Sequence, residues 1–518
     1  MPSIRTRVVA AVALGGAVLA FPATASAVDE INTKKLREQV TVSGILQHER
    51  ALQLIANRNG GTRASGTPGY DESAAYVRSR LAAAGYTVKH QEFTFPFTSV
   101  NSLSVSQVSP TPTEYETDSY EFSGSGDVTG RVVPVNDNVI PATPTPSSNA
   151  GCEASDFTPA STTAPEIALI QRGTCTFRQK ADNAVAAGYD AVIIFNEGNP
   201  ERTDLFVGTL DPPPASVPVL GLSYADGAAL DQQASSGNVV LRVAADITYD
   251  PNRKTTNIIG ESKDGDANKM LVVGAHLDSV LDGPGINDNG SGAAGILEIA
   301  EEMAENKIKP RQKVRFVFFG AEESGLLGSE HYVKAIGDSG VQRIFANLNF
   351  DMIGSPNYVR FVYDGDGSDT VDPATGEPAF GPPGSAQIED LFNRYFASQG
   401  LATEPTAFDG RSDYGPFIAA GIPAGGLFSG AEGVKTAEEA ATYGGTAGEP
   451  YDPCYHQACD TIANLSTKAL FELGDGAAHA VQTLAQTKTG FYEDGSRMAG
   501  RRAVKRGDGV YRGHAALR

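Results

Sequence analysis

Six residues with metal-binding side chains are spaced through the second half of this 518-residue chain: His276, Asp288, Glu322, Glu323, Asp351 and His456. Four of them follow short apolar runs, at 270–275, 314–321 and 344–350. Such runs indicate buried strands, and the ends of parallel strands meet at one crevice of an α/β sheet. Imidazoles and carboxylates that converge there are typical zinc ligands, and two ions need about this many. The set therefore predicts a hydrolase with two metal ions.

His276 stands in a His-x-Asp pattern with Asp278. A histidine after a buried strand can bind zinc through one ring nitrogen, and the other nitrogen then needs an orienting acceptor. Asp278 is a candidate for such a supporting position, either at this ring or elsewhere in the site. On its own the pattern is a weak signal, because most such pairs have only a structural role.

Asp288 lies in a glycine-rich stretch, residues 283–292. Glycine lets the backbone turn tightly beside an ion, and a helix that follows presents its positive N-terminus to nearby anions. Asp288 is therefore placed to bridge two metal ions. The alternative is a helix cap, a role that Asn289 or Ser291 could equally fill.

Glu322 and Glu323 are adjacent carboxylates after a strongly apolar run. Their burial is costly unless cations or protons compensate the charge. One of them can bind a metal ion while its neighbour acts as general base on a water molecule. The alternative is an acidic pair on a solvated surface, which the preceding Phe-Val-Phe-Phe run disfavours.

His456 follows a tyrosine and lies between two cysteines, Cys454 and Cys459. A disulfide between these cysteines would close a tight loop and hold the imidazole rigidly. Tyr455 could donate a hydrogen bond to a developing oxyanion. Its alternative role is packing.

The first 27 residues have the pattern of a signal peptide. Arg5 and Arg7 precede an apolar stretch at 8–20, and 25–27 is a small-x-small cleavage site. The alternative is a short membrane anchor, but the stretch is too short to span a bilayer comfortably. We therefore expect a secreted, extracellular protein. The formal net charge of −21 argues against nucleic acid and anionic membranes as partners.

The four cysteines are an even number in an exported chain, which predicts two disulfides. Proximity in the sequence favours Cys152 with Cys175 and Cys454 with Cys459. A thiolate metal site is the alternative, but neither pair has the two-residue spacing of a zinc knuckle.

Helical and strand patterns begin early, with expected helices at 41–57 and 70–84 and a strand at 86–93. Residues 100–165 are rich in Ser, Thr, Pro and Gly, which predicts loops and a domain boundary. Strands then alternate with helices, which predicts an α/β fold with a mixed, largely parallel sheet and helices on both faces. The expected organisation is a signal peptide at 1–27, the start of the main domain with a linker at 28–125, an inserted smaller domain at 126–248, the main domain with the metal site at 249–488, and a basic, flexible or processed tail at 489–518.

Together these motifs resemble the M28 peptidases, especially the secreted double-zinc aminopeptidases of the Streptomyces type. The resemblance covers roughly residues 40–100 and 250–485 and implies the zinc-exopeptidase fold. It implies that Glu322 is the catalytic base and that Tyr455 stabilises the tetrahedral intermediate. It also implies five ligands for two zinc ions, with no ligand position missing: His276, Asp288, Glu323, Asp351 and His456. A calcium site known in close relatives is not readable here.

The stretch at 408–417 also resembles this family, whose arginine there contacts substrate or product, here Arg411. Phe428 matches a residue that lines the specificity pocket. The inserted unit resembles a protease-associated (PA) domain through the stretches 171–177 and 186–196, and its Cys152 and Cys175 fit a disulfide often seen in such domains.

The resemblance implies removal of single N-terminal residues, preferably large and apolar, from peptides or proteins, and we expect a monomer. Three alternatives stay open. A glutaminyl cyclase shares the fold but uses one zinc ion and fewer ligands. A carboxypeptidase would need a carboxylate clamp, which Arg411 could supply. A binding ectodomain of the transferrin-receptor kind would have lost ligands that this chain retains.

Overall fold

The computed structural model of the chain describes residues 28–200, 202–371, 376–488 and 491. The predicted signal peptide and all of the predicted tail except Phe491 lie outside these residues. Within the described part, no helix has the length and apolar character needed to cross a membrane.

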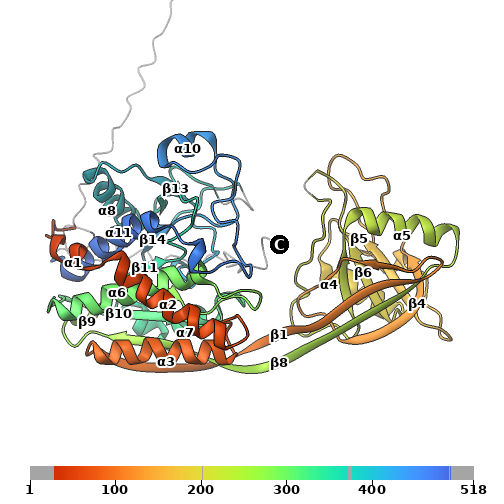
Figure 1. Ribbon diagram of the computed structural model, residues 1–518, viewed down its shortest axis with the longest axis horizontal. Coiled ribbons are helices and arrows are strands. Elements are labelled where there is room, and N and C mark those ends of the chain that lie inside the picture. Colours follow the sequence, from red (N-terminus) through yellow and green to blue (C-terminus); the bar gives the residue numbers. More distant parts are fainter. Residues whose placement is uncertain (1–27, 201, 372–375, 489–490, 492–518) are drawn as a thin grey trace, which may run out of the picture.

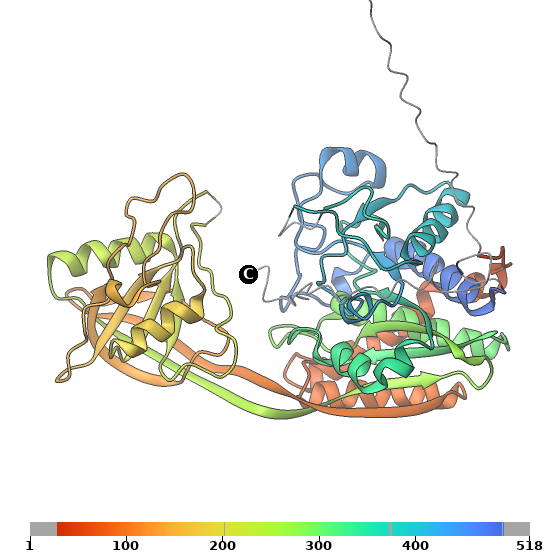
Figure 2. The same cartoon turned by 180° about the vertical axis from the view of Figure 1, so that it is seen from behind.

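The chain forms two lobes joined by a long antiparallel ribbon (Figures 1 and 2). Two strands make this ribbon, β1 (Thr87–Ser109) and β8 (Val240–Glu261), and each continues into the sheets of both lobes. We call residues 28–97 with 253–488 the larger lobe, and residues 100–249 the smaller lobe. The smaller lobe is therefore an insertion that leaves and re-enters the larger one through paired strands.

The larger lobe has a mixed sheet. Its strands are, in spatial order, β13 (Glu404–Thr406), β12 (Phe361–Tyr363), β14 (Ala424–Phe428), β11 (Ile344–Phe350), β9 (Asp266–His276), β10 (Gln312–Phe319), β8 and β1. The central strands β14, β11, β9 and β10 run parallel, whereas β8 and β12 pair antiparallel with their inner neighbours. The predicted largely parallel sheet is thus confirmed.

Both faces of this sheet are covered, because its central strands are apolar on both sides. Along β9, Leu271, Val273 and Ala275 join the core on one face, while Met270 and Val272 join the core on the other. The first face is covered by α1 (Lys34–Gln39), α2 (Val42–Arg58), α3 (Pro68–Ala83), α6 (Gly292–Glu305), α8 (Ser385–Ser398) and α11 (Thr467–Gln486). The second is covered by α7 (Leu327–Val341) and α9 (Gly415–Ala419). A further short helix, α10 (Ala437–Tyr443), lies in the C-terminal half.

The smaller lobe has its own sheet, which continues from the distal half of β8. Its parallel strands are β4 (Gly126–Pro134), β5 (Glu166–Gln171), β6 (Ala191–Phe195) and β7 (Val219–Leu222), with β3 (Asp118–Ser119) and β2 (Thr113–Tyr115) at edges. One face packs against α4 (Phe177–Ala186) and the other against α5 (Tyr224–Ser236).

The prediction of loops across residues 100–165 was wrong at the start and in the middle of that stretch, where the chain forms strands. Strand β1 continues to Ser109, and β4 begins at Gly126. In this part of β1, buried Val105 and Gln107 alternate with more exposed serines. A strand with one solvated face accepts Ser and Thr there, so their abundance did not mark a loop. Helix α5 was not expected either.

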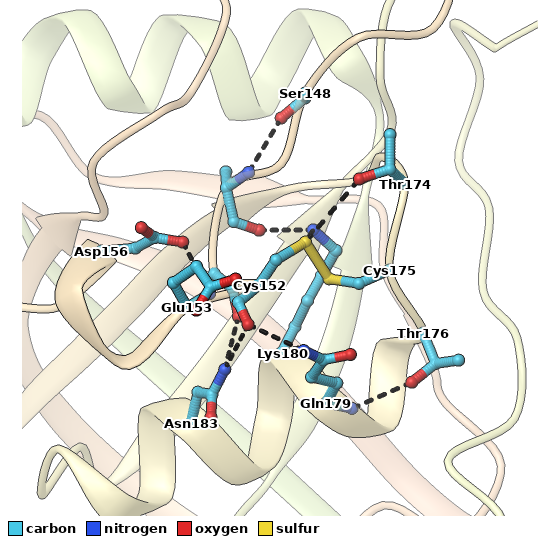
Figure 3. Close-up of a disulfide and its surroundings, with 12 residues drawn as sticks. Ser148, Cys152, Glu153, Asp156, Thr174, Cys175, Thr176, Gln179, Lys180 and Asn183 are labelled. Atoms are coloured by element: carbon cyan, nitrogen blue, oxygen red, sulfur yellow. Dashed lines mark hydrogen bonds between the residues drawn. A yellow bond between two sulfur atoms is a disulfide. The ribbon is translucent and has the colours of Figure 1, made fainter.

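Both predicted disulfides are present, and Figure 3 shows the one in the smaller lobe, Cys152–Cys175. The carbonyl of Cys152 accepts hydrogen bonds from the side chains of Gln179 (2.8 Å) and Asn183 (3.0 Å). Lys180 is fully buried below the disulfide and donates to the carbonyl of Ala150. Helix α4 therefore holds this part of the chain through its polar side chains.

Candidate metal centre

The ends of three adjacent parallel strands bring the predicted ligands together. His276 ends β9, Asp351 directly follows β11, and the Glu322–Glu323 pair follows β10. His276 Nε2 lies 3.3 Å from Asp351 Oδ1 and 3.9 Å from Glu322 Oε2. The shared edge of the sheet thus assembles side chains that are up to 75 positions apart.

Asp288 lies between two imidazoles. Its Oδ1 is 3.3 Å from His276 Nε2, and its Oδ2 is 3.2 Å from His456 Nε2. His456 Nε2 also lies 3.1 Å from Glu323 Oε2. Each half of the Asp288 carboxylate therefore faces one imidazole–carboxylate pair, His276 with Asp351 on one side and His456 with Glu323 on the other.

The backbone around Asp288 explains why glycines are needed there. Gly285 has φ = +57°, and a Cβ atom on Gly283 would lie 2.2 Å from the carbonyl oxygen of Gln457. The first amide of the following α6, that of Gly292, donates to the side-chain oxygen of Asn289 at 2.9 Å. Asp288 is thus not the helix cap, and its carboxylate is left to face the imidazoles.

The buried carboxylates of the site raise the pKa of both imidazoles. Burial alone would lower the pKa of His456, but Glu323 and Asp288 raise it to about 10. The pKa of His276 is shifted in the same direction. Burial lowers it, but Glu322 and Asp351 raise it well above its ordinary value. Burial also raises the pKa of Glu322. The carboxylates therefore favour positive charge at both imidazole positions, and bound metal ions would supply that charge.

The donor set fits two metal ions. Asp351 Oδ1 and Glu323 Oε1 are buried, and neither accepts a hydrogen bond from any described group. Buried polar atoms are normally satisfied, so these two oxygens indicate positions that a cation occupies. Two imidazoles and two further carboxylates around the central Asp288 carboxylate are a donor set that zinc favours.

Asp278 supports the site from behind. Its backbone oxygen lies 3.2 Å from His276 Nδ1, and its carboxylate lies 3.6 Å from the same nitrogen. The carboxylate also accepts from the backbone amides of Glu322 (3.3 Å) and Glu323 (3.4 Å). Asp278 thus contacts the histidine ring and fixes the turn that carries the acidic pair.

Tyr455 and Arg411 lie on one wall of the pocket beside these ligands. The Tyr455 ring stacks on His456 with centroids 3.9 Å apart, and Arg411 Nη2 donates to its hydroxyl at 3.4 Å. Arg411 Nη1 also pairs with Glu432 at 2.8 Å, a contact that sequence reasoning missed. Phe428 belongs to a largely apolar part of the lining, which also includes Met352, Tyr363, Thr406, Ala407 and Ala431.

Two further supporting residues lie inside motifs that the sequence had marked. Ser412 donates to Asp351 Oδ2 at 2.5 Å and so fixes one ligand. Asp460 accepts from the backbone amides of Asn287 (2.8 Å) and Asp288 (3.0 Å). The sequence signal that could have indicated these two residues is their position next to Arg411 and near His456 in the chain. Their hydrogen bonds to distant parts of the chain cannot be predicted from sequence spacing.

A second histidine–carboxylate cluster lies outside the pocket. His48, expected to be structural, is buried on α2 with Nε2 3.5 Å from Glu298 and 3.8 Å from Glu301. Arg80 Nε donates to Glu301 at 2.6 Å, so a cation already neutralises that carboxylate.

An acidic cluster around Asp364 also lies outside the pocket. Both carboxylate oxygens of Asp364 accept hydrogen bonds from loop amides at 367–370.

The Cys454–Cys459 disulfide closes the loop that carries Tyr455 and His456. We expect Cys454→Ser to reduce activity more than Cys152→Ser, because it frees this loop. Cys152→Ser should instead lower the free energy of unfolding more than Cys454→Ser. Loop-closure entropy gives about 3 kcal/mol for the longer loop that Cys152–Cys175 closes and about 2 kcal/mol for the short loop of Cys454–Cys459. Kinetic constants and urea unfolding of both variants measure the two effects. Equal activity losses would contradict this role of the loop.

Comparisons with known proteins identify the family. The family description "Peptidase family M28" matches residues 257–481, and "PA domain" matches 128–230. An aminopeptidase of Pseudomonas aeruginosa (strain UCBPP-PA14) is 46% identical over 473 residues, which cover 90% of this chain and 84% of the relative. The chain belongs to peptidase family M28.

Further similar proteins agree with this assignment. Leucine aminopeptidase 2 of Trichophyton tonsurans is 38% identical over 458 residues, covering 88% of this chain and 86% of the relative. Among solved structures, a zinc aminopeptidase from Bacillus subtilis is 26% identical with a TM-score of 0.62 and covers 87% of this chain and 95% of its own. The likeness to these proteins therefore extends over almost the whole described chain.

Proposed function

We propose that this M28 peptidase is a secreted aminopeptidase that binds two zinc ions and removes single N-terminal residues. The observation that supports it most is the Asp288 carboxylate between two imidazole–carboxylate pairs. The likeness to proteins named aminopeptidases and to a zinc aminopeptidase agrees with this reading. We assign His276, Asp288 and Asp351 to one ion, and His456, Asp288 and Glu323 to the other.

Bound zinc would polarise the scissile carbonyl and lower the pKa of a coordinated water to about 7. Glu322 would take the proton of the attacking water and pass it to the leaving amine. Its carboxylate is farther from His276 Nε2 (3.9 Å) than those of Asp288 and Asp351 (3.3 Å), which suits a base rather than a ligand. Tyr455 would donate its hydroxyl proton to the developing oxyanion.

Recognition of a free N-terminus would rest on charge. The pocket walls carry an excess of carboxylates, which can hold the substrate ammonium beside the metal centre. Phe428 and its apolar neighbours would receive the first side chain, so large apolar residues are favoured. The name of the Trichophyton relative, a leucine aminopeptidase, agrees with that preference.

The alternatives are less well supported. A carboxypeptidase would need Arg411 as a carboxylate clamp, but Glu432 already pairs with this guanidinium at 2.8 Å. A glutaminyl cyclase needs one zinc ion, whereas the donors here form two sets. A purely binding ectodomain would have no use for a complete ligand set.

We extend the proposal to the whole chain. Residues 1–27 would be the signal peptide, 28–125 the start of the peptidase domain with a linker, 126–248 the PA domain, 249–488 the rest of the peptidase and 489–518 a tail. Two disulfides agree with an extracellular location, where oxidation persists. The partners would be peptide or protein N-termini, and the enzyme would act as a monomer.

The deciding experiment compares leucine p-nitroanilide with its N-acetyl form. Acetylation removes the charge of the amine and adds bulk at the closed end of the pocket. We expect hydrolysis of the free substrate and at least about 10³-fold lower kcat/KM for the blocked one, since a lost buried charge pair is worth several kcal/mol. A peptide blocked at both ends is the control for an endopeptidase. Rapid cleavage of either blocked substrate would overturn the proposed function, even in a zinc-loaded enzyme.

A further inference from the structure

The loop that carries Asp288, residues 283–291, is held by a buried cation that plays no part in metal ligation. Arg63 is fully buried, and all of its guanidinium's hydrogen-bond acceptors among the described residues are backbone carbonyls. Nε donates to Pro284 at 2.8 Å, while the two terminal nitrogens donate to Leu277 and Gly285. Leu277 directly follows His276. One side chain thus ties the end of strand β9 to the loop of the bridging carboxylate.

A buried anion holds the same loop by its amides. Asp460 is 1% exposed, and its two carboxylate oxygens accept from the backbone N–H groups of Asn287 (2.8 Å) and Asp288 (3.0 Å). Its own carbonyl accepts from Ile286 at 3.1 Å. Asp460 comes four residues after His456, so it also links the loop of Asp288 to the loop of the second histidine.

The Arg63 charge is buried without an ion-pair partner. Burying a guanidinium in this way is costly, and the described residues place no carboxylate within ion-pair distance of it, only the three carbonyls. Burial lowers the pKa of Arg63, and the first charge that opposes this is Glu49, whose own pKa burial raises well above its ordinary value. Glu49 is fully buried and accepts no hydrogen bond from the described groups. Arg63 and Asp460 both hydrogen-bond to the backbone of this loop. Among the described residues, the loop carries the one carboxylate that faces both imidazoles, that of Asp288.

We propose that Arg63 and Asp460 are positioning residues that clamp the loop of Asp288 and so set the geometry of the metal centre. Arg63 fixes the carbonyl side of the loop and Asp460 fixes the amide side. Their loss should weaken metal binding through Asp288 although neither side chain touches the ions. This inference rests on the proposed two-metal site and extends it to two residues that bind no metal, one of which, Arg63, lies more than 200 positions before His276 in the sequence.

The test uses Arg63→Lys in the full-length protein, which keeps the charge but cannot reproduce the three-way hydrogen bonding. The matched control is Arg360→Lys, because Arg360 is also buried and donates to the carbonyl of Ala402 (2.7 Å) and to Glu472 (2.5 Å), away from the pocket. Zinc affinity is measured by competition with a chelator, and the visible spectrum of the cobalt-substituted protein reports ligand geometry. Tm is measured for both variants.

We expect Arg63→Lys to bind zinc about 10- to 100-fold more weakly and to change the cobalt spectrum, as loss of outer contacts typically does. Arg360→Lys should lower Tm with neither effect. If both variants lose Tm but keep wild-type affinity and spectrum, Arg63 is merely structural and the inference fails. If Arg63→Lys does not fold, Asp460→Asn decides by the same two readouts. A wild-type protein that binds no zinc would instead refute the proposed function.

Discussion

Replacing Glu322 with glutamine should leave both zinc ions in place and lower kcat by about 10³- to 10⁴-fold, at the upper end of what a general base contributes. The amide fills the same space but cannot accept a proton from the attacking water. Because the two ligand sets do not use Glu322, metal content by elemental analysis should stay at the wild-type value. KM for leucine p-nitroanilide should change little, since the base acts in the transition state.

The adjacent residue provides the matched control for this assignment. Glu323→Gln should weaken binding of the ion that His456 holds, because Glu323 Oε2 lies 3.1 Å from His456 Nε2. Added zinc should then restore part of the lost activity, which it cannot do for Glu322→Gln. If Glu322→Gln lost metal and Glu323→Gln kept it, the two roles would have to be exchanged.

Removing the carboxylate of Asp288 should have the second large effect. Asp288→Ala takes one ligand from each of the two sets at once, and it leaves His276 and His456 without the anion between them. We expect loss of both zinc ions during dialysis and a fall in activity of at least about 10³-fold, because metal supplies both carbonyl polarisation and the nucleophile. Elemental analysis and kcat/KM measure the two losses.

His456→Ala is the control that distinguishes a ligand of one metal ion from a ligand shared by both. It removes a ligand from one set only, so the protein should retain one ion bound by His276, Asp288 and Asp351. Retention of one ion by Asp288→Ala, or loss of both by His456→Ala, would contradict the bridging position of Asp288. Circular dichroism should confirm that each variant is folded.

Much of the fold and site was readable from the sequence because its signals are local. Strands β9, β10 and β11 were predicted from apolar runs, and the ligands stand where those runs end. Helices α2 and α3 were predicted from 3.6-residue periodicity. Parallel strands of one sheet share an edge, so a ligand's place in the chain already predicts its place in space.

Other features could not be read because they depend on pairing across long sequence separations. The ribbon of β1 and β8 was missed, since Thr87 pairs with Glu261 and a solvated strand rich in Ser and Thr resembles a loop. His48 meets Glu298 only because α2 packs on α6. Glu432 pairs with Arg411, 21 positions earlier in the chain, and no periodic sequence pattern predicts this contact.

The sequence by itself thus determined the chemical type of the site: which residues carry donor atoms, and that strand ends and a glycine-rich turn present them together. Only the tertiary structure decided how those donors are divided into two sets around Asp288, and which buried charges hold them. The physical reason is that donor chemistry belongs to single residues, whereas the contacts of Arg63 with carbonyls more than 200 positions away exist only after the α2–α3 region has packed beneath the loop.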